Sequence, residues 1–468
     1  MIRFLLAGMI LVGWRVAAET NQLRPSVLIL IADQWRAQAF GYAGDTTVKT
    51  PHIDALEHES SDFTHAIASV PVCCPTRASL LTGQRALTHG VFLNDVPLAA
   101  DAVTFAKVLQ TQGYDTGYIG KWHLNGDGRS DFIPRERRQG FDYWKVLECT
   151  HNYNHSFYYG DAPKKLEWPG YDAIAQTHDA QEYLRNRATN SRPFLLVLSW
   201  GPPHSPYGTA PEKYRALYEP ATMTLRGNVP RETVAGWRRD LAGYYAHCSA
   251  LDDCVGDLLQ TLHETGLEQR TIVIFTSDHG DMLGSHGLSA KQKPFDESIR
   301  VPMLFRCPSA LGIKARPLDA LITSEDFMPT LLGLCRAPLP ATVEGIDYSD
   351  YMRGKANPAQ DAALILNIAP FGEWDRRHGG KEYRGIRTQR FTYVRGLEGA
   401  WLLFDNQKDP LQLTNLANQP AGAAWQAELD KVLRDKLRQT HDQFLPAAAY
   451  IKQWGYGVDT NGTVPYTN

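Results

Sequence analysis

Three uninterrupted apolar runs constrain the fold of this chain more than any other feature. The runs SVLILIAD, PFLLVLSW and TIVIFTS begin at Ser26, Pro193 and Thr271, and each one passes directly into polar residues. A strand that is apolar on both faces is typical of a parallel sheet with helices on either side. Open α/β sheets bind their ligands where such strands end. We therefore expect a buried parallel sheet with functional residues along one edge.

Helical patterns separate these runs and complete the prediction of fold class. Residues 102–113 and 245–266 show helical periodicity and end at Gly113 and Gly266, and a shorter apolar run follows Asp115. Alternating strands and helices indicate βαβ units. The prediction is an α/β fold with a large mixed, mainly parallel sheet sandwiched by helices.

The pattern changes after about residue 360. The segments EYRGIRTQRFTYVRG and AWLLFDNQKDPLQLTNLA alternate apolar and polar residues between turn signals, and an amphipathic helix is expected over 423–444. Such alternation is typical of antiparallel strands. We therefore expect a catalytic domain over residues 19–360 and a smaller C-terminal α+β subdomain over 361–468, made of an antiparallel sheet and a helix.

The N-terminus has the features of a secretory signal peptide. Arg3 precedes an apolar run over residues 4–14, and small residues lead to an expected cleavage site near Ala18. The run is too short to span a membrane, and no later segment is apolar for long enough to do so. The sequence predicts a secreted or periplasmic protein over 19–468, with residues 1–18 as its signal peptide and no stable membrane span.

The net charge and the cysteines indicate which partners and which cysteine chemistry the chain can have. The formal net charge is −3 over 468 residues, which argues against a nucleic-acid partner because such binders carry a basic excess. Export permits disulfides, but seven cysteines is an odd number, so at least one is unpaired. Cys73 and Cys74 are adjacent, a spacing that suits neither a disulfide nor a zinc site.

Polar residues that follow the apolar runs suggest which ligand binds at the carboxyl edge of the predicted sheet. Oxygen ligands with an imidazole suit a divalent cation such as Ca²⁺ or Mg²⁺, and lysines around them indicate that the ligand on that cation is an anion. Such a site is suited to clamping a sulfate or phosphate and stabilising its transfer. The residues are Asp33, Gln34, Lys121, His123, His204, Asp278, His279 and Lys291.

The segment from Cys73 to Arg77, CCPTR, followed by LTG at 81–83, resembles the C-x-P-x-R…T-G signature of the type I, formylglycine-dependent sulfatases. This family belongs to the alkaline-phosphatase-like superfamily. GYIGKWHL, SDHGDMLGSHGL and KPFDESIRVP resemble further blocks of the family in the same order, and GIRTQRFTYV and LFDNQKDPLQLTNLA resemble its C-terminal subdomain.

The resemblance implies that a formylglycine-generating maturation enzyme oxidises Cys73 to formylglycine (3-oxoalanine). One hydroxyl of the hydrated aldehyde attacks sulfur and releases the alcohol, and loss of a proton from the second expels sulfate. Pro75 favours the first turn of a helix, so Cys73 is expected at a helix N-terminus, where negative charge is stabilised. Arg77, one turn further, is expected to reach the hydrate oxygens or the metal ligands.

The resemblance also implies a metal site made of Asp33, Gln34, Asp278, His279 and the modified Cys73. Many family members carry a second Asp where this chain has Gln34, and an Asn where it has His279. Fewer carboxylates leave the identity of the metal open between Ca²⁺, which we expect first, and Mn²⁺ or Mg²⁺.

The remaining catalytic roles follow from the matching blocks. Lys121 and Lys291 are expected to bind the sulfate oxygens as point charges. His123 is expected to take the hydrate proton, and His204 to protonate the leaving oxygen or hold the sulfate, since imidazole can do either near neutral pH.

Two irregular segments are candidates for substrate recognition. Residues 147–161 are dense in His, Asn and Tyr, and residues 370–380 contain four further candidates. Aromatic faces stack on sugars and arginines pair with sulfates or carboxylates, although both segments read equally well as surface loops. The four candidates are Trp374, Arg376, Arg377 and His378.

Three hypotheses of function remain at this point. The leading one is a sulfuric ester hydrolase that removes sulfate from a sulfated poly- or oligosaccharide. The second is a phosphonate or phosphate mono- or diester hydrolase, or a choline-sulfatase-like enzyme, on the same scaffold; choline sulfate would favour an aromatic cage without arginines. The third is a protein that binds sulfated glycans without turnover, if Cys73 is not matured.

Overall fold

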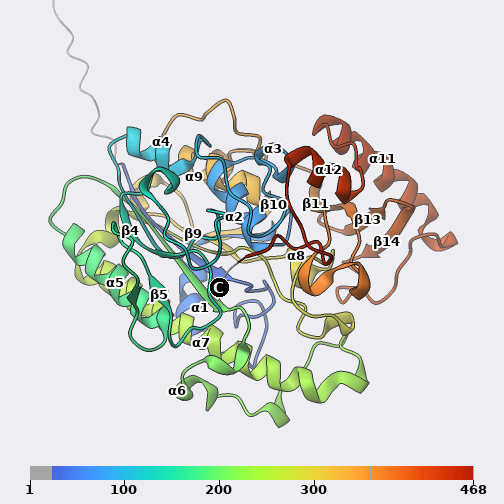
Figure 1. Cartoon of the computed structure of the whole chain (residues 1–468), viewed down its shortest axis with the longest axis horizontal. Helices are drawn as coiled ribbons and strands as arrows, with labels where there is room; N and C mark the ends of the chain where they lie inside the picture. Colours follow the sequence, from blue (N-terminus) through green and yellow to red (C-terminus); the bar gives the residue numbers. More distant parts are fainter. Residues whose placement is uncertain (1–23, 359, 467–468) are drawn as a thin grey trace, which may run out of the picture.

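We describe a computed structural model of the chain, which covers residues 24–358 and 360–466 (Figure 1). The predicted signal peptide, residues 1–18, lies outside the described residues. Among the described helices, none is both long enough and apolar enough to cross a membrane.

An eight-stranded mixed sheet forms the centre of the molecule. Its order is β10-β2-β9-β8-β1-β7-β3-β4, and only β9 runs antiparallel to its two neighbours. This confirms the predicted fold class. The strands in this order are Arg316–Thr323, Ser61–Ile67, Met303–Arg306, Thr271–Ser277, Ser26–Asp33, Phe194–Pro203, Asp115–Lys121 and Tyr143–Leu147.

Helices cover both faces of this sheet, and alternate residues of β1 contact the two layers. Val27, Ile29 and Ile31 belong to one core and Leu28, Leu30 and Ala32 to the other. Because every residue of β1 is buried, its run of branched and Leu residues needs no polar face. The first layer contains α2 (Cys73–Thr82), α4 (Phe105–Thr111) and α9 (Phe327–Cys335); the second contains α1 (Pro51–His58), α5 (Asp172–Arg187) and α7 (Val234–Glu264).

A four-stranded antiparallel sheet and the helix α11 form the C-terminal part, coloured orange to red in Figure 1. Apolar residues between the sheet and α11 form one small core, and residues on the other face of the sheet pack with Ile67 and Ile299 of the main part. The elements are β11 (Ala363–Asn367), β12 (Tyr383–Arg387), β13 (Phe391–Gly396), β14 (Gly399–Asp405) and α11 (Ala423–Gln439).

The end of the chain returns to the main part. Ala447 and Tyr450 of α12 (Ala447–Trp454) belong to the first large core, and the Tyr456 hydroxyl donates a hydrogen bond to the Gly90 carbonyl (2.9 Å). The eight-stranded and four-stranded sheets lie on either side of residue 360, but α12 packs against the main part, so the predicted domain boundary stays a prediction. The shorter elements are α3 (Ala86–His89), β5 (Phe157–Tyr158), β6 (Leu166–Glu167), α6 (Glu212–Arg215), α8 (Asp296–Ile299) and α10 (Ser349–Met352).

Candidate active site

The carboxyl ends of β1 and β8 meet the N-terminus of α2 at one edge of the large sheet. Asp33 ends β1, Asp278 and His279 follow β8, and Cys73 begins α2. One potential ligand atom from each of these four side chains lies within 4.8 Å of the others, and all four residues are buried. The sheet topology therefore brings together residues that are up to 246 positions apart in the sequence.

Cys73 lies in the middle of this cluster. Its Sγ is 3.3 Å from His279 Nε2, 3.8 Å from Asp33 Oδ1 and 3.8 Å from Lys121 Nζ. Burial and the negative charge of Asp33 raise the pKa of the thiol, but the positive charges of Lys121, Lys291 and His279 outweigh them and hold the pKa well below its ordinary value. The environment at this position therefore stabilises a negatively charged group.

Arg77, one turn into α2, connects the two carboxylates of the cluster. Its Nε donates to Asp278 Oδ2 (3.1 Å) and its Nη2 to Asp33 Oδ2 (3.3 Å), while Nη1 donates to Ser199 Oγ (2.7 Å). The planar fork of a guanidinium makes all three bonds in one orientation, which a lysine cannot do.

Lys121, at the end of β3, supplies the second compensating charge. Its Nζ is 2.5 Å from Asp33 Oδ2. Burial alone would raise the pKa of Asp33, but Lys121, His204 and Arg77 lower it well below its ordinary value. Asp33 is therefore ionised at neutral pH, as a metal ligand must be.

The donor set fits the divalent cation that the sequence predicts. Asp33 and Asp278 offer carboxylate oxygens and His279 offers an imidazole nitrogen, and the three are accompanied by the Cys73 side chain. Hard oxygen donors with one imidazole suit Ca²⁺, Mg²⁺ or Mn²⁺.

Gln34, the fifth predicted ligand, is held at the side of this cluster. Its Oε1 accepts a hydrogen bond from Lys291 Nζ (3.1 Å), and its Nε2 donates to Asp281 Oδ2 (2.7 Å). The backbone N–H of Gln34 donates to Asp278 Oδ1 (3.0 Å), and its φ of 70° is in the left-handed region that non-glycine residues rarely adopt. Its role as a ligand stays a prediction, while Asp281 is a positioning partner that the sequence reading missed.

Lys291 and His204 form a hydrogen-bonded pair next to Gln34. Lys291 Nζ donates to His204 Nε2 (2.6 Å), and His204 Nδ1 is 2.9 Å from the Ser205 carbonyl. Burial and then the charge of Lys291 lower the pKa of His204 well below its ordinary value. In this arrangement His204 is neutral, and its Nε2 accepts a hydrogen bond from Lys291 Nζ. The proton shared by the pair therefore resides on Lys291.

His123 lies beside Cys74 rather than against the Cys73 thiol. Its Nε2 is 3.0 Å from Asp95 Oδ1, and Arg129 forms an ion pair with the same carboxylate (2.8 Å). Its Nδ1 is buried without a hydrogen-bond partner among the described residues. The imidazole that contacts the Cys73 thiol directly belongs to His279, one of the predicted metal ligands, and the role of His123 as proton acceptor stays a prediction.

Two side chains extend the site beyond the predicted set. Glu373 Oε1 is 3.9 Å from Lys291 Nζ, and the ring of His151 stacks on His204 with centroids 4.7 Å apart. Both residues lie in the segments that the sequence reading singled out for substrate recognition. Neither was named, because an isolated polar residue in a loop has no periodic signal.

Trp374 is part of a small core and not of an open surface. It is 4% exposed, and its ring lies near those of Tyr383 (6.3 Å) and Trp401 (6.5 Å). The indole therefore anchors its segment, and its faces are occupied by protein.

The three basic candidates that follow Trp374 are exposed but already bonded to other residues of the chain, and Arg377 also donates to Asn461 Oδ1 near the C-terminus. Arg376 pairs with Glu382 (2.5 Å), and Arg377 and His378 both bind the Asp375 carboxylate, at 3.0 and 2.8 Å. Their predicted contact with substrate stays a prediction.

All seven cysteines lie in the described part of the chain, and each is a free thiol. Cys74 is buried behind Cys73, where its Sγ accepts from the Asp95 backbone N–H (3.4 Å). The adjacent cysteines therefore have different environments, and the six thiols whose pairing the sequence left open are unpaired.

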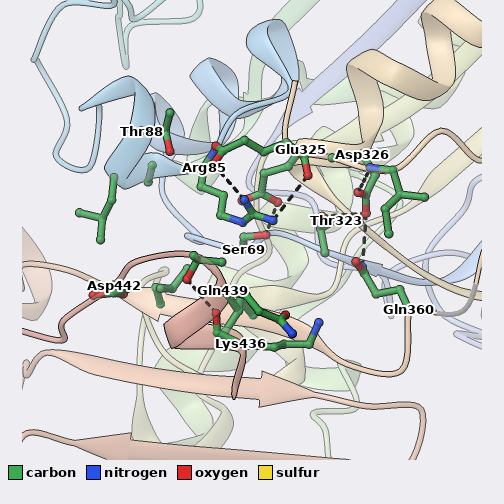
Figure 2. A pocket seen from close by; sticks show the side chains of 18 of the residues that line it. Ser69, Arg85, Thr88, Thr323, Glu325, Asp326, Gln360, Lys436, Gln439 and Asp442 are labelled. Carbon is green, nitrogen blue, oxygen red and sulfur yellow. Dashed lines mark hydrogen bonds and ion pairs between the residues drawn. The ribbon is translucent and has the colours of Figure 1, made fainter. Parts of the chain in front are cut away.

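A separate cavity of about 130 Å³ lies between the main part and the C-terminal part (Figure 2). Arg85 enters it from α3 and Lys436 from α11, and Glu325 and Asp326 face them from the end of β10. Arg85 already pairs with Glu344 (2.9 Å). None of the predicted site residues is among the described residues that line this cavity, so it is distinct from the cluster around Cys73.

Comparisons with known proteins place the observed cluster in context. The family profile described as Sulfatase matches residues 25–337, and a profile described as N-sulphoglucosamine sulphohydrolase, C-terminal, matches residues 284–440. An ulvan-active sulfatase from Formosa agariphila is 42% identical over 455 residues, which cover 96% of this chain and 88% of that protein. An endo-4-O-sulfatase from Bacteroides thetaiotaomicron is 29% identical over 84% of this chain and 88% of its own length.

A solved structure agrees with the sequence comparisons. A Bacteroides fragilis protein named as a candidate sulfatase superposes with a TM-score of 0.82 at 30% identity. The match covers 93% of this chain and 99% of that structure. The similarity therefore includes both sheets.

Proposed function

This chain belongs to the sulfatase family, and from that premise we propose that it is a hydrolase that removes sulfate from a sulfated poly- or oligosaccharide through a modified Cys73. The observation that carries the proposal is the buried cluster around Cys73, in which two carboxylates, an imidazole and two cations surround one side chain. A group at position 73 is thereby held where negative charge is stabilised and water is excluded.

Formylglycine at position 73 would supply, as its hydrate, one hydroxyl that attacks sulfur and a second whose deprotonation expels sulfate. A divalent cation held by Asp33, Asp278, His279 and the side chain at 73, with Gln34 beside it, would lower the pKa of a bound hydroxyl and polarise the sulfate. We place Ca²⁺ first among the candidates and Mn²⁺ or Mg²⁺ after it.

The side chains around position 73 have the remaining roles, which are sulfate binding and proton transfer. Lys121 and Lys291 both act on position 73 with their positive charges and hold the sulfate oxygens as point charges. Lys291 carries the proton shared with His204, so this pair protonates the leaving oxygen. Arg77 keeps Asp33 and Asp278 in place, and His123 accepts the proton from the group at 73, since His279 Nε2 is a ligand of the cation.

The relatives support the proposed substrate class. Among them are proteins named for ulvan and for endo-4-O desulfation. We propose a sulfated carbohydrate for this chain too, bound in the opening beside Lys291 and His204. We further propose that the protein is exported after cleavage near Ala18, as the pattern of residues 1–18 indicates.

One experiment tests the function and its alternatives together. The protein, produced alongside a formylglycine-generating enzyme and loaded with Ca²⁺, is assayed on defined sulfated saccharides, on choline sulfate and on matched phosphate and phosphonate esters. Sulfate release from a saccharide, lost in Cys73→Ala, is the expected result. Faster cleavage of phosphonate esters or of choline sulfate would contradict the proposed substrate class.

The mass of the peptide that contains residue 73 tests the nucleophile separately. Formylglycine is expected in the active protein. A plain cysteine at full activity would exclude formylglycine, and a plain cysteine with saccharide binding but no turnover would favour a binding protein.

A further inference from the structure

We propose that Glu373 determines substrate specificity by accepting a hydrogen bond from a free hydroxyl next to the scissile sulfate and by excluding a second anionic group at that position. The inference rests on the proposed function, because it takes Lys291 to hold the sulfate. It goes beyond that function by assigning a chemical feature of the sugar itself.

Glu373 is held rigidly although it lies in an irregular segment. The backbone of Phe371 is clamped by Gln292, whose Nε2 donates to its carbonyl (3.0 Å) and whose Oε1 accepts from its N–H (3.4 Å). On the other side of Glu373, the buried ring of Trp374 packs with Tyr383 and Trp401. Because Gln292 directly follows Lys291, the segment that carries Glu373 is fixed to the same backbone that carries the sulfate-binding lysine.

The carboxylate of Glu373 is partly exposed and forms only a long ion pair with Lys291. Its Oε1 is 3.9 Å from Lys291 Nζ, too far for a hydrogen bond, and its side chain is 41% exposed. Lys291 already donates to His204 and Gln34. Glu373 therefore faces the opening of the site with its hydrogen-bonding capacity unused by Lys291.

This placement of the carboxylate favours a hydroxyl group over an anionic group as its ligand. An ionised carboxylate only accepts hydrogen bonds, so it can bind a sugar hydroxyl but not a sulfate or a uronate carboxylate. At contact distance near a protein surface, repulsion between two like charges is strong enough to weaken the binding of an anion more than tenfold relative to a neutral hydroxyl. A sulfate ester held at Lys291 brings the adjacent ring substituent towards Glu373, so a free hydroxyl is accepted there and a second anion is rejected.

The test compares wild type with Glu373→Gln on paired saccharides that carry the same scissile sulfate and either a hydroxyl or a second sulfate on the adjacent carbon. Glutamine keeps the shape and removes the charge. We expect the ratio of kcat/KM for the hydroxyl substrate to that for the disulfated substrate to fall at least tenfold. Glu398→Gln removes the same charge from an exposed turn of the C-terminal sheet and is the matched control, for which the ratio should change less than twofold.

Inhibition by inorganic sulfate separates recognition of the sugar from an effect on Lys291. We expect the inhibition constant for sulfate to fall in Glu373→Gln, because a negative charge near Lys291 is removed, but by a smaller factor than the substrate ratio. An unchanged substrate ratio, or a sulfate inhibition constant that shifts as much as the ratio, would overturn the inference. Failure of wild type to release sulfate from any saccharide would instead overturn the proposed function, so the two failures are distinguishable.

Discussion

At the scale of single residues, Arg77 makes the strongest energetic prediction. It binds two fully buried carboxylates, and removing one partner of a buried ion pair leaves a charge uncompensated. We expect Arg77→Met to lower the free energy of unfolding by about 3–5 kcal/mol and to abolish activity. Arg77→Lys should recover part of the stability, because it restores the charge but not the fork.

Urea denaturation of the metal-loaded protein measures this effect. Arg85→Met is the control, since Arg85 forms a more exposed pair with Glu344, and such pairs contribute about 0–1 kcal/mol. Equal losses in the two methionine variants would contradict the importance of the buried network.

Much of the site was predictable at this scale, because residues at the ends of buried strands share one edge of a sheet. Asp33, Lys121 and Asp278 were found in this way, and Cys73 through its motif. Contacts made by loops were not predictable. Glu373 and His151 lie close to Lys291 and His204 only because backbone clamps and core packing place their segments there.

At the scale of secondary structure, the close approach of β3 and β7 sets the position of Lys121. Gly120 has φ 99°, and a Cβ there would overlap the carbonyl oxygen of Ser199 in β7. We expect Gly120→Ala to destabilise the protein by about 3 kcal/mol or more and to reduce activity sharply, since strain and overlap add. Gly113→Ala has a similar φ of 83° with nothing within 4 Å, and should cost only about 1 kcal/mol.

Thermal unfolding and activity measured on both alanine variants decide the point. If both lose the same stability, the left-handed backbone alone explains the effect. In that case the contact between the strands does not constrain Lys121.

The first residue of α5 gives a pH-dependent prediction. Burial raises the pKa of Asp172 to about 8, and its Oδ1 has no hydrogen-bond partner among the described residues. The folded state therefore keeps this proton while the unfolded state loses it near pH 4, so stability is lost as the pH rises from about 4 towards 8. We expect Asp172→Asn to be more stable than wild type at pH 8 by about 1–3 kcal/mol, with a smaller difference at pH 5.

Denaturant midpoints between pH 5 and 8.5 test this expectation. Glu182→Gln on the same helix, where the side chain is exposed, should follow wild type throughout. A constant difference between Asp172→Asn and wild type over the whole range would show that ionisation of Asp172 does not matter.

Prediction at this scale succeeded for the strands that are buried on both faces and missed β2 and β9. The runs that became β1, β7 and β8 are apolar throughout, whereas β9 has four residues and β2 alternates buried with half-buried positions. Helix α7 begins at Val234, eleven residues before the expected start, because its first turns are largely solvent-facing and have no apolar periodicity.

At the scale of the whole molecule, a buried ion pair joins the two sheets. Arg387 of β12 donates from Nε and Nη2 to the two oxygens of Asp296 in α8, both at 3.0 Å. We expect Arg387→Met to destabilise the protein by about 3 kcal/mol or more and to lower activity, because the segment that carries Glu373 lies between β11 and β12. Arg390→Met, which removes an ion pair within the C-terminal part, should cost about 1 kcal/mol or less.

Calorimetry and sulfate release from a saccharide check this prediction. A loss in Arg387→Met no larger than that in Arg390→Met would mean that apolar packing alone docks the C-terminal sheet. The existence of this sheet was predictable from alternation, but its docking was not, because Arg387 and Asp296 are ordinary charged residues until the chain is folded.

The burial of Cys73 limits when an enzyme can reach its sulfur during synthesis and folding. Its side chain is 1% exposed once β8 has brought Asp278 and His279 against it, and those residues are synthesised about two hundred positions later. An enzyme that acts on the sulfur therefore has access while the later strands are still missing or unpaired. Under the maturation that we propose for Cys73, the rate at which the sheet is completed would set the fraction of molecules that are modified before Cys73 is buried.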